Sequence, residues 1–338
     1  LSVGGRCAVS AVGDDEETVE VVLSGTLAQF EALVDRLADG GDGLAALAAE
    51  VEAAVAGEGT VTPTGRAGDG AGAATDEPAG ADYPWEDGTA VMGIVNVTPD
   101  SFHDGGEYNT VEAARERARE MVDAGVEILD VGGESTRPGA DPVPVEEEKQ
   151  RVVPVIEALA DLDAMVSVDT RRAEVARAAL DAGADILNDV SGLEDPEMRL
   201  VAADHDVPVV VMHSIETPVD PDTDVHYDDV VDDVVDYLTE RVLLAEKAGL
   251  DRSQILVDPG IGFGKSAAES FELVDRLGEL EALGCPILVG HSHKSMFGLV
   301  DGGRGDALDE TVAATALLAD RGVDVVRVHD AHENVAAV

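Results

Sequence analysis

The stretch "VMGIVNVTPDSFHDGG", residues 91–106, begins as an apolar strand and passes into a polar loop that starts at Asn96 and ends at two glycines. A continuous apolar run of this length is typical of a strand buried on both faces. Similar runs recur along the chain, at residues 126–132, 164–170, 184–190, 208–213, 254–260, 286–292 and 323–330.

Helical patterns lie between these eight apolar runs. One follows a predicted cap at Thr110, and a long one ends at Gly249. Strands that alternate with helices predict an α/β fold with a parallel sheet. Eight such units in about 250 residues predict a closed (β/α)8 TIM barrel. An open doubly wound sheet is the alternative, which the number of strands disfavours. A short pattern after Asp330 predicts a short last helix.

Two further stretches precede the barrel, which is expected at 87–338. Residues 1–58 read as a small α/β accessory segment, with strands at 7–12 and 18–24 and two helical patterns after them. Residues 59–86 are rich in Gly, Ala, Thr and Pro and read as a flexible linker.

The charge of the chain is strongly negative. Its 338 residues include 71 acidic and 22 basic ones, a formal net charge of -49, and the acids are spread along the helices. Such self-repulsion is relieved at high salt, so we expect a protein adapted to the salty cytoplasm of a halophile. An acidic mesophilic protein is the alternative. This charge argues against nucleic acid and anionic membranes as partners.

The cysteines and the apolar runs bear on location. Cys7 and Cys285 are isolated and form no cluster with metal-ligand spacing, which suggests a reducing compartment. The sequence has no secretory signal pattern, and no apolar run approaches the roughly 18 residues of a membrane span. We therefore expect a cytoplasmic protein. The chain begins at Leu1 rather than Met, which suggests a start inside a longer gene product.

Polar residues stand at the carboxyl end of every predicted strand. In a parallel barrel these ends meet at one face, where active sites are built. An Asp or Asn there can simply cap the next helix, which we expect for one of Asn188 and Asp189, and His213 is more simply a packed histidine. Mixed charges converging on one rim are more typical of a polar ligand site. The candidates are Asn96, Thr136, Arg137, Asp169, Asn188, Asp258, Ser292, Lys294, Arg327 and His329.

The segment "PGIGFGKS" resembles a phosphate-binding loop but lacks its first glycine, where Pro259 stands. Its glycines more simply let the backbone lie close to a flat ligand. The side-chain types suit a heterocycle with amide-like edges: Lys294 can donate to a ring carbonyl or nitrogen, and Arg327 can stack on a ring or bind phosphate with His329. Asn96 offers a neutral oxygen to a cation such as Mg²⁺.

Seven motifs in order carry a resemblance to a known family. They are "GIVNVTPDSFHDGG", "GGESTRPGA", "SVDT", "NDVSG", "DPGIGFGK", "HKS" and "VRVHD". Together they resemble dihydropteroate synthase over about residues 90–330. The resemblance implies a transferase of folate biosynthesis that joins 4-aminobenzoate to 6-hydroxymethyl-7,8-dihydropterin diphosphate, with Mg²⁺ and release of diphosphate.

The resemblance also implies roles for individual residues. Asn96 would contact Mg²⁺ and diphosphate, and residues 96–106 would form a lid hinged at Gly105 and Gly106. Arg137 and Pro138 would lie near the aminobenzoate with Ser292. The pterin would be held by Asp169, Asn188, Asp258 and Lys294, and the diphosphate by Thr136, Arg327 and His329. Phe263 is a further substrate-binding candidate. The catalytic residues would be Asp169, Asp258, Lys294 and Arg327.

The sequence departs from the family at His293, where arginine is usual before the lysine. Residues 1–86 fall outside the resemblance, and haloarchaeal relatives can be fused to a folylpolyglutamate synthase domain, so this piece is interpreted as a remnant of such a fusion. Family members are commonly dimers, so a homodimer is one expectation. The alternatives are a pterin-dependent methyltransferase that serves a corrinoid, and a non-catalytic pterin-binding barrel.

Overall fold

The computed structural model divides the chain into two compact units, Leu1–Asp82 and Tyr83–Val338. In the first unit, β1 (Arg6–Ser10) pairs antiparallel with β2 (Glu20–Ser24), where the sequence predicts two strands. The two predicted helical patterns of this unit and the linker up to residue 82 lie outside the described residues. The structure describes residues 6–10, 20–24, 83–97, 107–134, 143–215, 225–301 and 307–338.

The second unit contains eight parallel strands in the order β8-β7-β6-β5-β4-β3-β10-β9. The two ends of this order meet through a parallel bridge between Val257 and Ile287, and the Val257 N–H donates to the Pro286 carbonyl at 2.8 Å. The predicted closed barrel is therefore confirmed. The strands are β3 (Ala90–Asn96), β4 (Ile128–Gly132), β5 (Met165–Asp169), β6 (Ile186–Asp189), β7 (Val209–Met212), β8 (Ile255–Asp258), β9 (Leu288–Gly290) and β10 (Val325–Val328).

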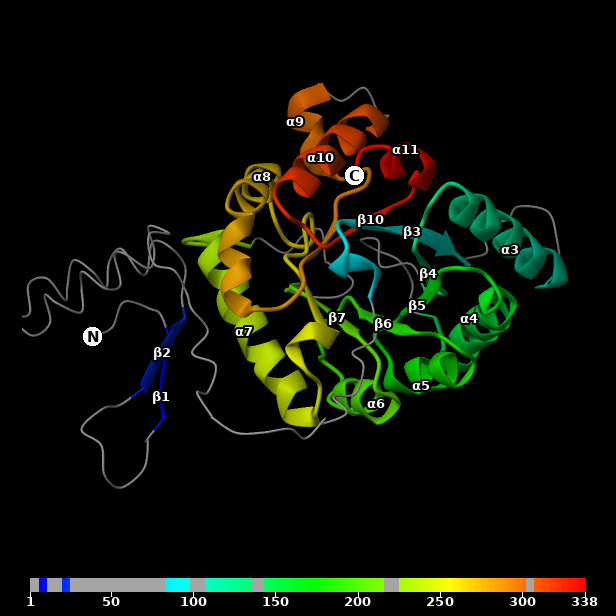
Figure 1. Cartoon of the computed structure of the whole chain (residues 1–338), viewed down its shortest axis with the longest axis horizontal. Helices are drawn as coiled ribbons and strands as arrows, with labels where there is room; N and C mark the ends of the chain where they lie inside the picture. The colour runs from blue at the N-terminus through cyan, green and yellow to red at the C-terminus, as the bar shows by residue number, and fades with distance from the viewer. Residues whose placement is uncertain are drawn as a thin grey trace, which may run out of the picture. The chain divides into compact units, whose positions relative to one another are not determined.

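Helices surround the strands and follow one another in chain order (Figure 1). None of those within the described ranges is long and apolar enough to cross a membrane. The helices are α3 (Glu107–Asp123), α4 (Val145–Leu159), α5 (Ala173–Asp181), α6 (Met198–His205), α7 (Val230–Ala248), α8 (Ala267–Asp275), α9 (Gly298–Asp301), α10 (Leu308–Asp320) and α11 (Ala331–Val335), with 3₁₀ turns η1 (Pro84–Glu86), η2 (Arg252–Gln254), η3 (Leu277–Leu283) and η4 (Ser295–Phe297).

The ends of two helices test the predicted caps. Helix α7 ends at Gly249, whose φ of 117° is the left-handed conformation that favours glycine, as predicted. Helix α3 begins at Glu107, so the predicted cap at Thr110 is wrong. Thr110 lies inside the helix, whereas an N-cap residue has non-helical backbone angles. The last helix, α11, is short, as predicted.

The strands divide the core into two layers, because successive side chains point to opposite faces. Met92 belongs to the cluster inside the barrel, whereas Val91 and Val95 pack outward against the helices. Trp85 is 5% exposed and joins the inner cluster, with its ring stacked on Tyr83 at 4.6 Å between centroids. The barrel unit thus begins at Tyr83, four residues before the predicted boundary.

Candidate active site

The carboxyl ends of the strands form one aligned rim. Asn96 lies opposite Gly132, Gly132 opposite Asp169, and Asp169 opposite Asn188. The strand register therefore places polar residues that are far apart in the sequence at one level of the barrel. This is the arrangement that the sequence predicts for Asn96, Asp169 and Asn188.

A network of buried charges centres on Arg327. Its Nε donates to Asp130 Oδ2 at 2.6 Å, and its Nη2 donates to Asp169 Oδ2 at 2.6 Å. Burial opposes the charge on Arg327, but the two carboxylates outweigh this effect and raise its pKa. Burial raises the pKa of Asp169 to about 7, although the charge of Arg327 acts against the shift. Arg327 and Asp169, both predicted site residues, are thus in direct contact.

Asp130 is a member of this network that the sequence reading missed. It is fully buried on β4, and besides Arg327 it accepts hydrogen bonds from Ser167 Oγ at 2.7 Å and Asn188 Nδ2 at 3.2 Å. Its carboxylate therefore orients both the guanidinium of Arg327 and the amide of Asn188. The sequence does contain a signal for Asp130, because it is an ionisable residue in the middle of the apolar run 126–132. A charged side chain in a buried strand needs a buried partner.

Asp258, Phe263 and Lys294 form a second group at the rim, near Arg327. The ammonium of Lys294 lies 4.3 Å from the centroid of the Phe263 ring. Burial lowers the pKa of Lys294 to about 8, and the nearby Asp258 acts in the opposite direction. Burial raises the pKa of Asp258 to about 6, against a hydrogen bond from the Gly260 N–H and the charge of Lys294. The structure therefore brings these three predicted residues together.

Ser292 and His329 form a third contact at the rim. Ser292 Oγ lies 3.1 Å from both the backbone nitrogen and the Nδ1 of His329. The ring of His329 also meets the ring of His293 edge to face, with 5.8 Å between centroids. His293 has a φ of 53° and its Nε2 bonds to Asp330. The histidine that replaces the usual arginine is thus tied to the chain beside His329.

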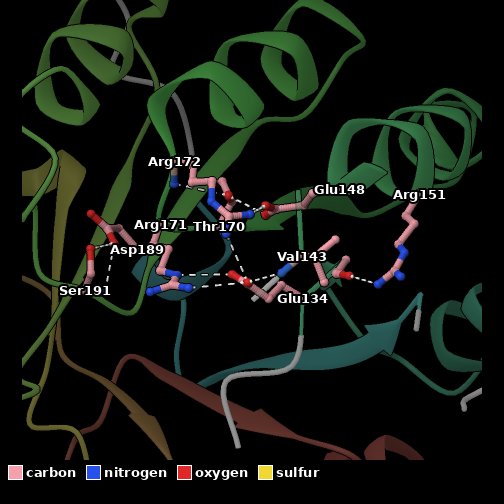
Figure 2. Close-up of polar contacts among 10 residues, drawn as sticks. Glu134, Val143, Glu148, Arg151, Thr170, Arg171, Arg172, Asp189 and Ser191 are labelled. Atoms are coloured by element: carbon pink, nitrogen blue, oxygen red, sulfur yellow. Dashed lines mark hydrogen bonds and ion pairs between the residues drawn. The ribbon is translucent and has the colours of Figure 1, made fainter. Parts of the chain in front are cut away.

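A further ionic cluster lies where β4 and β5 end, around Glu134. Figure 2 shows its carboxylate between Arg171, Arg172 and the backbone of Val143. Glu134 Oε1 accepts from the Val143 N–H at 2.8 Å, so one side chain joins the two described ends of the segment 135–142. Burial opposes ionisation of Glu134, but the hydrogen bonds from Arg171 and Val143 lower its pKa overall.

The same cluster reaches helix α4 through Glu148, which is fully buried. Glu148 accepts from Thr170 Oγ1 at 2.6 Å and is paired with Arg172. A buried carboxylate without such partners is costly, so the arginine pair and these two glutamates depend on each other. The sequence reading missed Glu134, although it stands inside the "GGESTRPGA" motif.

Two rim residues serve the local structure. Asp189 Oδ1 accepts from the Ser191 N–H at 2.8 Å and Oδ2 from the Leu193 N–H at 2.9 Å, so this carboxylate stabilises its own turn, as expected for one of the Asn188–Asp189 pair. His213 is 5% exposed and packs against the ring of Tyr237, with 4.9 Å between centroids. It is a packed histidine, as predicted.

Some predicted residues cannot be placed in this way. Thr136, Arg137 and Pro138, together with residues 98–106 of the predicted lid, lie outside the described residues. Among the residues that are described, no group of three or more His, Cys, Asp and Glu side chains could hold a metal ion. Asn96 is partly buried at the end of β3.

The chemistry of the rim follows from these contacts. The groups at the rim of the barrel are hydrogen-bond acceptors from carboxylates, a donor from Lys294 and an aromatic face from Phe263. Such a set suits the edge and the face of a flat, polar heterocycle.

Comparisons with known proteins show which family the chain belongs to. The sequence pattern of a family described as "Pterin binding enzyme" matches residues 92–329. A dihydropteroate synthase from Escherichia coli is 44% identical over 250 residues, which cover 73% of this chain and 89% of that protein. The solved structure of Xanthomonas albilineans dihydropteroate synthase with 4-aminobenzoic acid matches with a TM-score of 0.69 and 48% identity, over 74% of this chain and 91% of that chain.

A longer relative matches the whole chain. A probable bifunctional folylpolyglutamate synthase/dihydropteroate synthase from Haloferax volcanii is 64% identical over 344 residues, which cover 100% of this chain and 40% of that protein. The chain therefore spans less than half of the length of this relative.

Proposed function

Because the chain belongs to the pterin-binding enzyme family, and within it to the dihydropteroate synthases, we propose that its barrel joins 4-aminobenzoate to 6-hydroxymethyl-7,8-dihydropterin diphosphate. The products would be dihydropteroate and diphosphate. The observation that carries this proposal is that Lys294, Asp258 and Phe263 lie at the same rim as the Arg327–Asp169 ion pair.

The pterin would lie flat at the rim, in contact with both groups. Lys294 can donate to the ring carbonyl, and the carboxylate of Asp258 can accept from the ring N–H and amino groups. Phe263 offers its ring as an apolar face. Asn188, held by Asp130, can both donate and accept along the same edge.

The two ion pairs of Arg327 bear on its role. The resemblance assigns this arginine to the diphosphate, yet its Nε and Nη2 are directed at Asp130 and Asp169. This arrangement supports a role at the pterin, where the guanidinium plane can stack on the ring. His329 and Asn96 are then the described candidates for the diphosphate end.

The proposed reaction needs no protein nucleophile. The bond between the pterin methylene carbon and the diphosphate oxygen breaks, and its electron pair leaves with diphosphate. The aniline nitrogen of 4-aminobenzoate then forms the C–N bond and loses a proton. The carboxylates of Asp169 and Asp258 would stabilise the positive charge that develops on the pterin.

A divalent cation fits the proposal only together with the substrate. Magnesium usually keeps several waters and binds through one or two protein oxygens plus substrate phosphates. Asn96 supplies one neutral oxygen at the rim, which fits an ion that arrives with the diphosphate rather than a resident metal. When bound, Mg²⁺ would neutralise the charge of the leaving diphosphate.

Turnover of labelled 4-aminobenzoate with the pterin diphosphate, in molar KCl with and without Mg²⁺, tests this function. We expect dihydropteroate only when the cation is present. Folded protein that binds the pterin but forms no product with Mg²⁺ would favour the non-catalytic alternative. Formation of methylcorrinoid from a methyl-tetrahydropterin would favour the methyltransferase.

We also infer a homodimer and a need for high salt. Three apolar side chains on α9 and α10 support the dimer, since Leu299, Val300 and Leu317 are 66%, 67% and 43% exposed. The net charge of -49 supports the salt requirement. Light scattering tests the dimer, and a monomer at micromolar concentration would contradict it. Unfolding monitored by circular dichroism as KCl is removed tests the salt requirement, whereas unchanged stability would contradict it. A cytoplasmic location stays a prediction.

A further inference from the structure

The loop after β8, residues 258–265, packs closely on the end of β7. Gly260, Gly262 and Gly264 have φ values of 66°, 79° and 63°, which favour glycine. A Cβ atom on Gly260 would lie 2.0 Å from the carbonyl oxygen of His213, so no larger residue fits there. The alternating glycines thus give this loop a compact backbone whose carbonyl groups need partners.

Lys265 supplies a partner for these carbonyl groups. Its Nζ lies 2.9 Å from the Gly260 oxygen, 3.0 Å from the Phe263 oxygen and 3.4 Å from the His213 oxygen. The Nδ1 of His213 lies 2.9 Å from the same ammonium. A lysine ammonium has three N–H donors and no acceptor, so Lys265 donates in all four contacts and two of the acceptors share one hydrogen. The side chain therefore ties the loop to itself and to β7.

The protonation of both partners is consistent with this arrangement. Burial lowers the pKa of His213 to about 3, and the charge of Lys265 acts in the same direction, so the imidazole is neutral and its Nδ1 can accept. Burial lowers the pKa of Lys265 to about 7, against the charge of Asp258. The hydrogen bonds from Lys265 to its four acceptors therefore replace only part of the hydration that its ammonium loses on burial.

The other face of the loop carries the site. The ring of Phe263 lies under the ammonium of Lys294, and a Cβ atom on Gly262 would be 3.2 Å from Lys294 Cδ. The Gly260 N–H donates to Asp258 Oδ1 at 2.7 Å. The backbone that Lys265 holds from one side is thus the backbone that orients Asp258, Phe263 and Lys294 on the other.

We propose that Lys265 is a positioning residue for the pterin ring, since its ammonium fixes the loop that places Phe263 and Lys294. The residue itself does not touch the pterin. The proposal rests on the proposed function, because that function supplies the pterin as the occupant of the site. It also gives a role to the lysine of a motif that resembles a phosphate-binding loop without being one.

The substitution Lys265→Met tests this role, because it keeps most of the length of the side chain and removes the donors. Binding of 6-hydroxymethylpterin is measured by calorimetry in molar KCl, and folding by circular dichroism. We expect about tenfold weaker binding, equivalent to about 1.4 kcal/mol. With the full substrates, KM for the pterin diphosphate rises whereas kcat changes little, because no reacting atom loses a contact.

Lys247→Met is the matched control, because Lys247 is an exposed lysine in the last turn of α7. It should bind the pterin within about twofold of the unsubstituted protein, the scatter expected of surface substitutions. Binding by a folded Lys265→Met variant that matches this control would overturn the proposal. Failure of the unsubstituted protein to bind pterin would instead overturn the proposed function, so the two failures are distinguishable.

A second variant decides the matter if Lys265→Met does not fold. Lys265→Arg keeps the charge, but a planar guanidinium cannot direct its hydrogens to the same acceptors. We expect faster hydrogen–deuterium exchange in residues 260–264 together with weaker pterin binding. Unchanged pterin binding by this variant would overturn the proposal, whatever its exchange rates.

Discussion

The two ends of the same eight strands differ sharply in chemistry. Four strands, β3, β5, β6 and β8, begin with an apolar residue and end with an acid or an amide. At the starting end, Trp85 and the inner cluster exclude water. At the finishing end, carboxylates, a guanidinium and two ammonium groups are held in or near the barrel.

The difference shows how a parallel barrel separates stability from function. All strand starts lie at one end and all strand finishes at the other, so each end can be built for one task. Burial of apolar surface at the starting end stabilises the fold. At the finishing end the raised pKa values of Asp169 and Asp258 show that desolvation works against their charged forms. Substitutions at the two ends should therefore separate activity from stability.

Replacement of Lys294 should give the largest effect on activity. Lys294→Ala removes the donor to the pterin carbonyl, and loss of such a charged hydrogen bond at a site is expected to lower kcat/KM by about 10²–10³-fold. The thermal unfolding midpoint should change little, because desolvation already disfavours the ammonium. Steady-state kinetics and differential scanning calorimetry check both parts.

Lys247→Ala is the matched control and should keep the full rate. A folded Lys294→Ala variant that turns over as fast as this control would contradict the placement of the pterin. Asp169→Asn extends the test to the carboxylate that pairs with Arg327, and a full rate in both site variants would exclude the site as a whole.

Replacement of Trp85 should give the opposite result at the starting end. Trp85→Ala removes a large ring that is 5% exposed, which is expected to cost about 3–5 kcal/mol of the free energy of unfolding. Urea unfolding in molar KCl measures this loss. The folded variant should keep its kcat/KM, because Trp85 lies at the strand starts. Trp85→Phe should lose less stability, and a loss of activity in either folded variant would show that the two ends are coupled.

The fold could be predicted from the sequence because its main signals are local. Each apolar run was long enough to be a strand, and the alternation of these runs with helical patterns predicted the barrel. The glycine at position 249 predicted the end of α7. The start of α3 was less predictable, because a glutamate and a threonine, both residue types that favour a helix start, stand only three positions apart at 107 and 110. The contribution of Trp85 was missed because a single aromatic residue beside a linker has no periodic pattern around it.

The site was predictable in its residue types rather than in its contacts. Asp169, Asp258 and Lys294 stood at strand ends and were expected to converge. The partners of Arg327 could not be predicted, because Asp130 lies inside a strand. Its pairing with Arg327 depends on the register of strands that are far apart in the sequence. Lys265 was set aside with the loop motif, since only coordinates show which carbonyl groups its ammonium meets.

Replacement of Glu134 should give a smaller effect that is confined to one substrate. Glu134→Gln keeps the shape of the side chain but loses the charge that pairs with Arg171 and Arg172. Since Glu134 joins the ends of the segment that carries Thr136 and Arg137, we expect KM for 4-aminobenzoate to rise about tenfold, a typical loss for a charged hydrogen bond. Binding of the pterin should be unchanged.

Glu146→Gln is the control for this test, because the Glu146 side chain is 80% exposed and pairs with Lys149 on α4. Such pairs contribute little. An equal rise in KM for both variants would show that general charge, rather than the position of Glu134, is responsible.

The smallest expected effect is the pH dependence that the finishing end confers. As pH falls, Asp169 takes up a proton near pH 7 and Asp258 near pH 6, so neither can then act on the pterin as a carboxylate. As pH rises through about 8, Lys294 loses its charge, so kcat/KM should follow a bell-shaped profile and fall about twofold at each pKa. Lys265, with a pKa of about 7, adds a shallower component on the alkaline side.

The variant Lys294→Arg keeps its positive charge over this pH range, so its profile should lose the step near pH 8 and retain the acid limb. Since Trp85 has no group that titrates, Trp85→Phe should keep both limbs. If the alkaline limb is unchanged in Lys294→Arg, a group other than Lys294 sets it. The activity at the finishing end of the strands would then depend on a different charged residue.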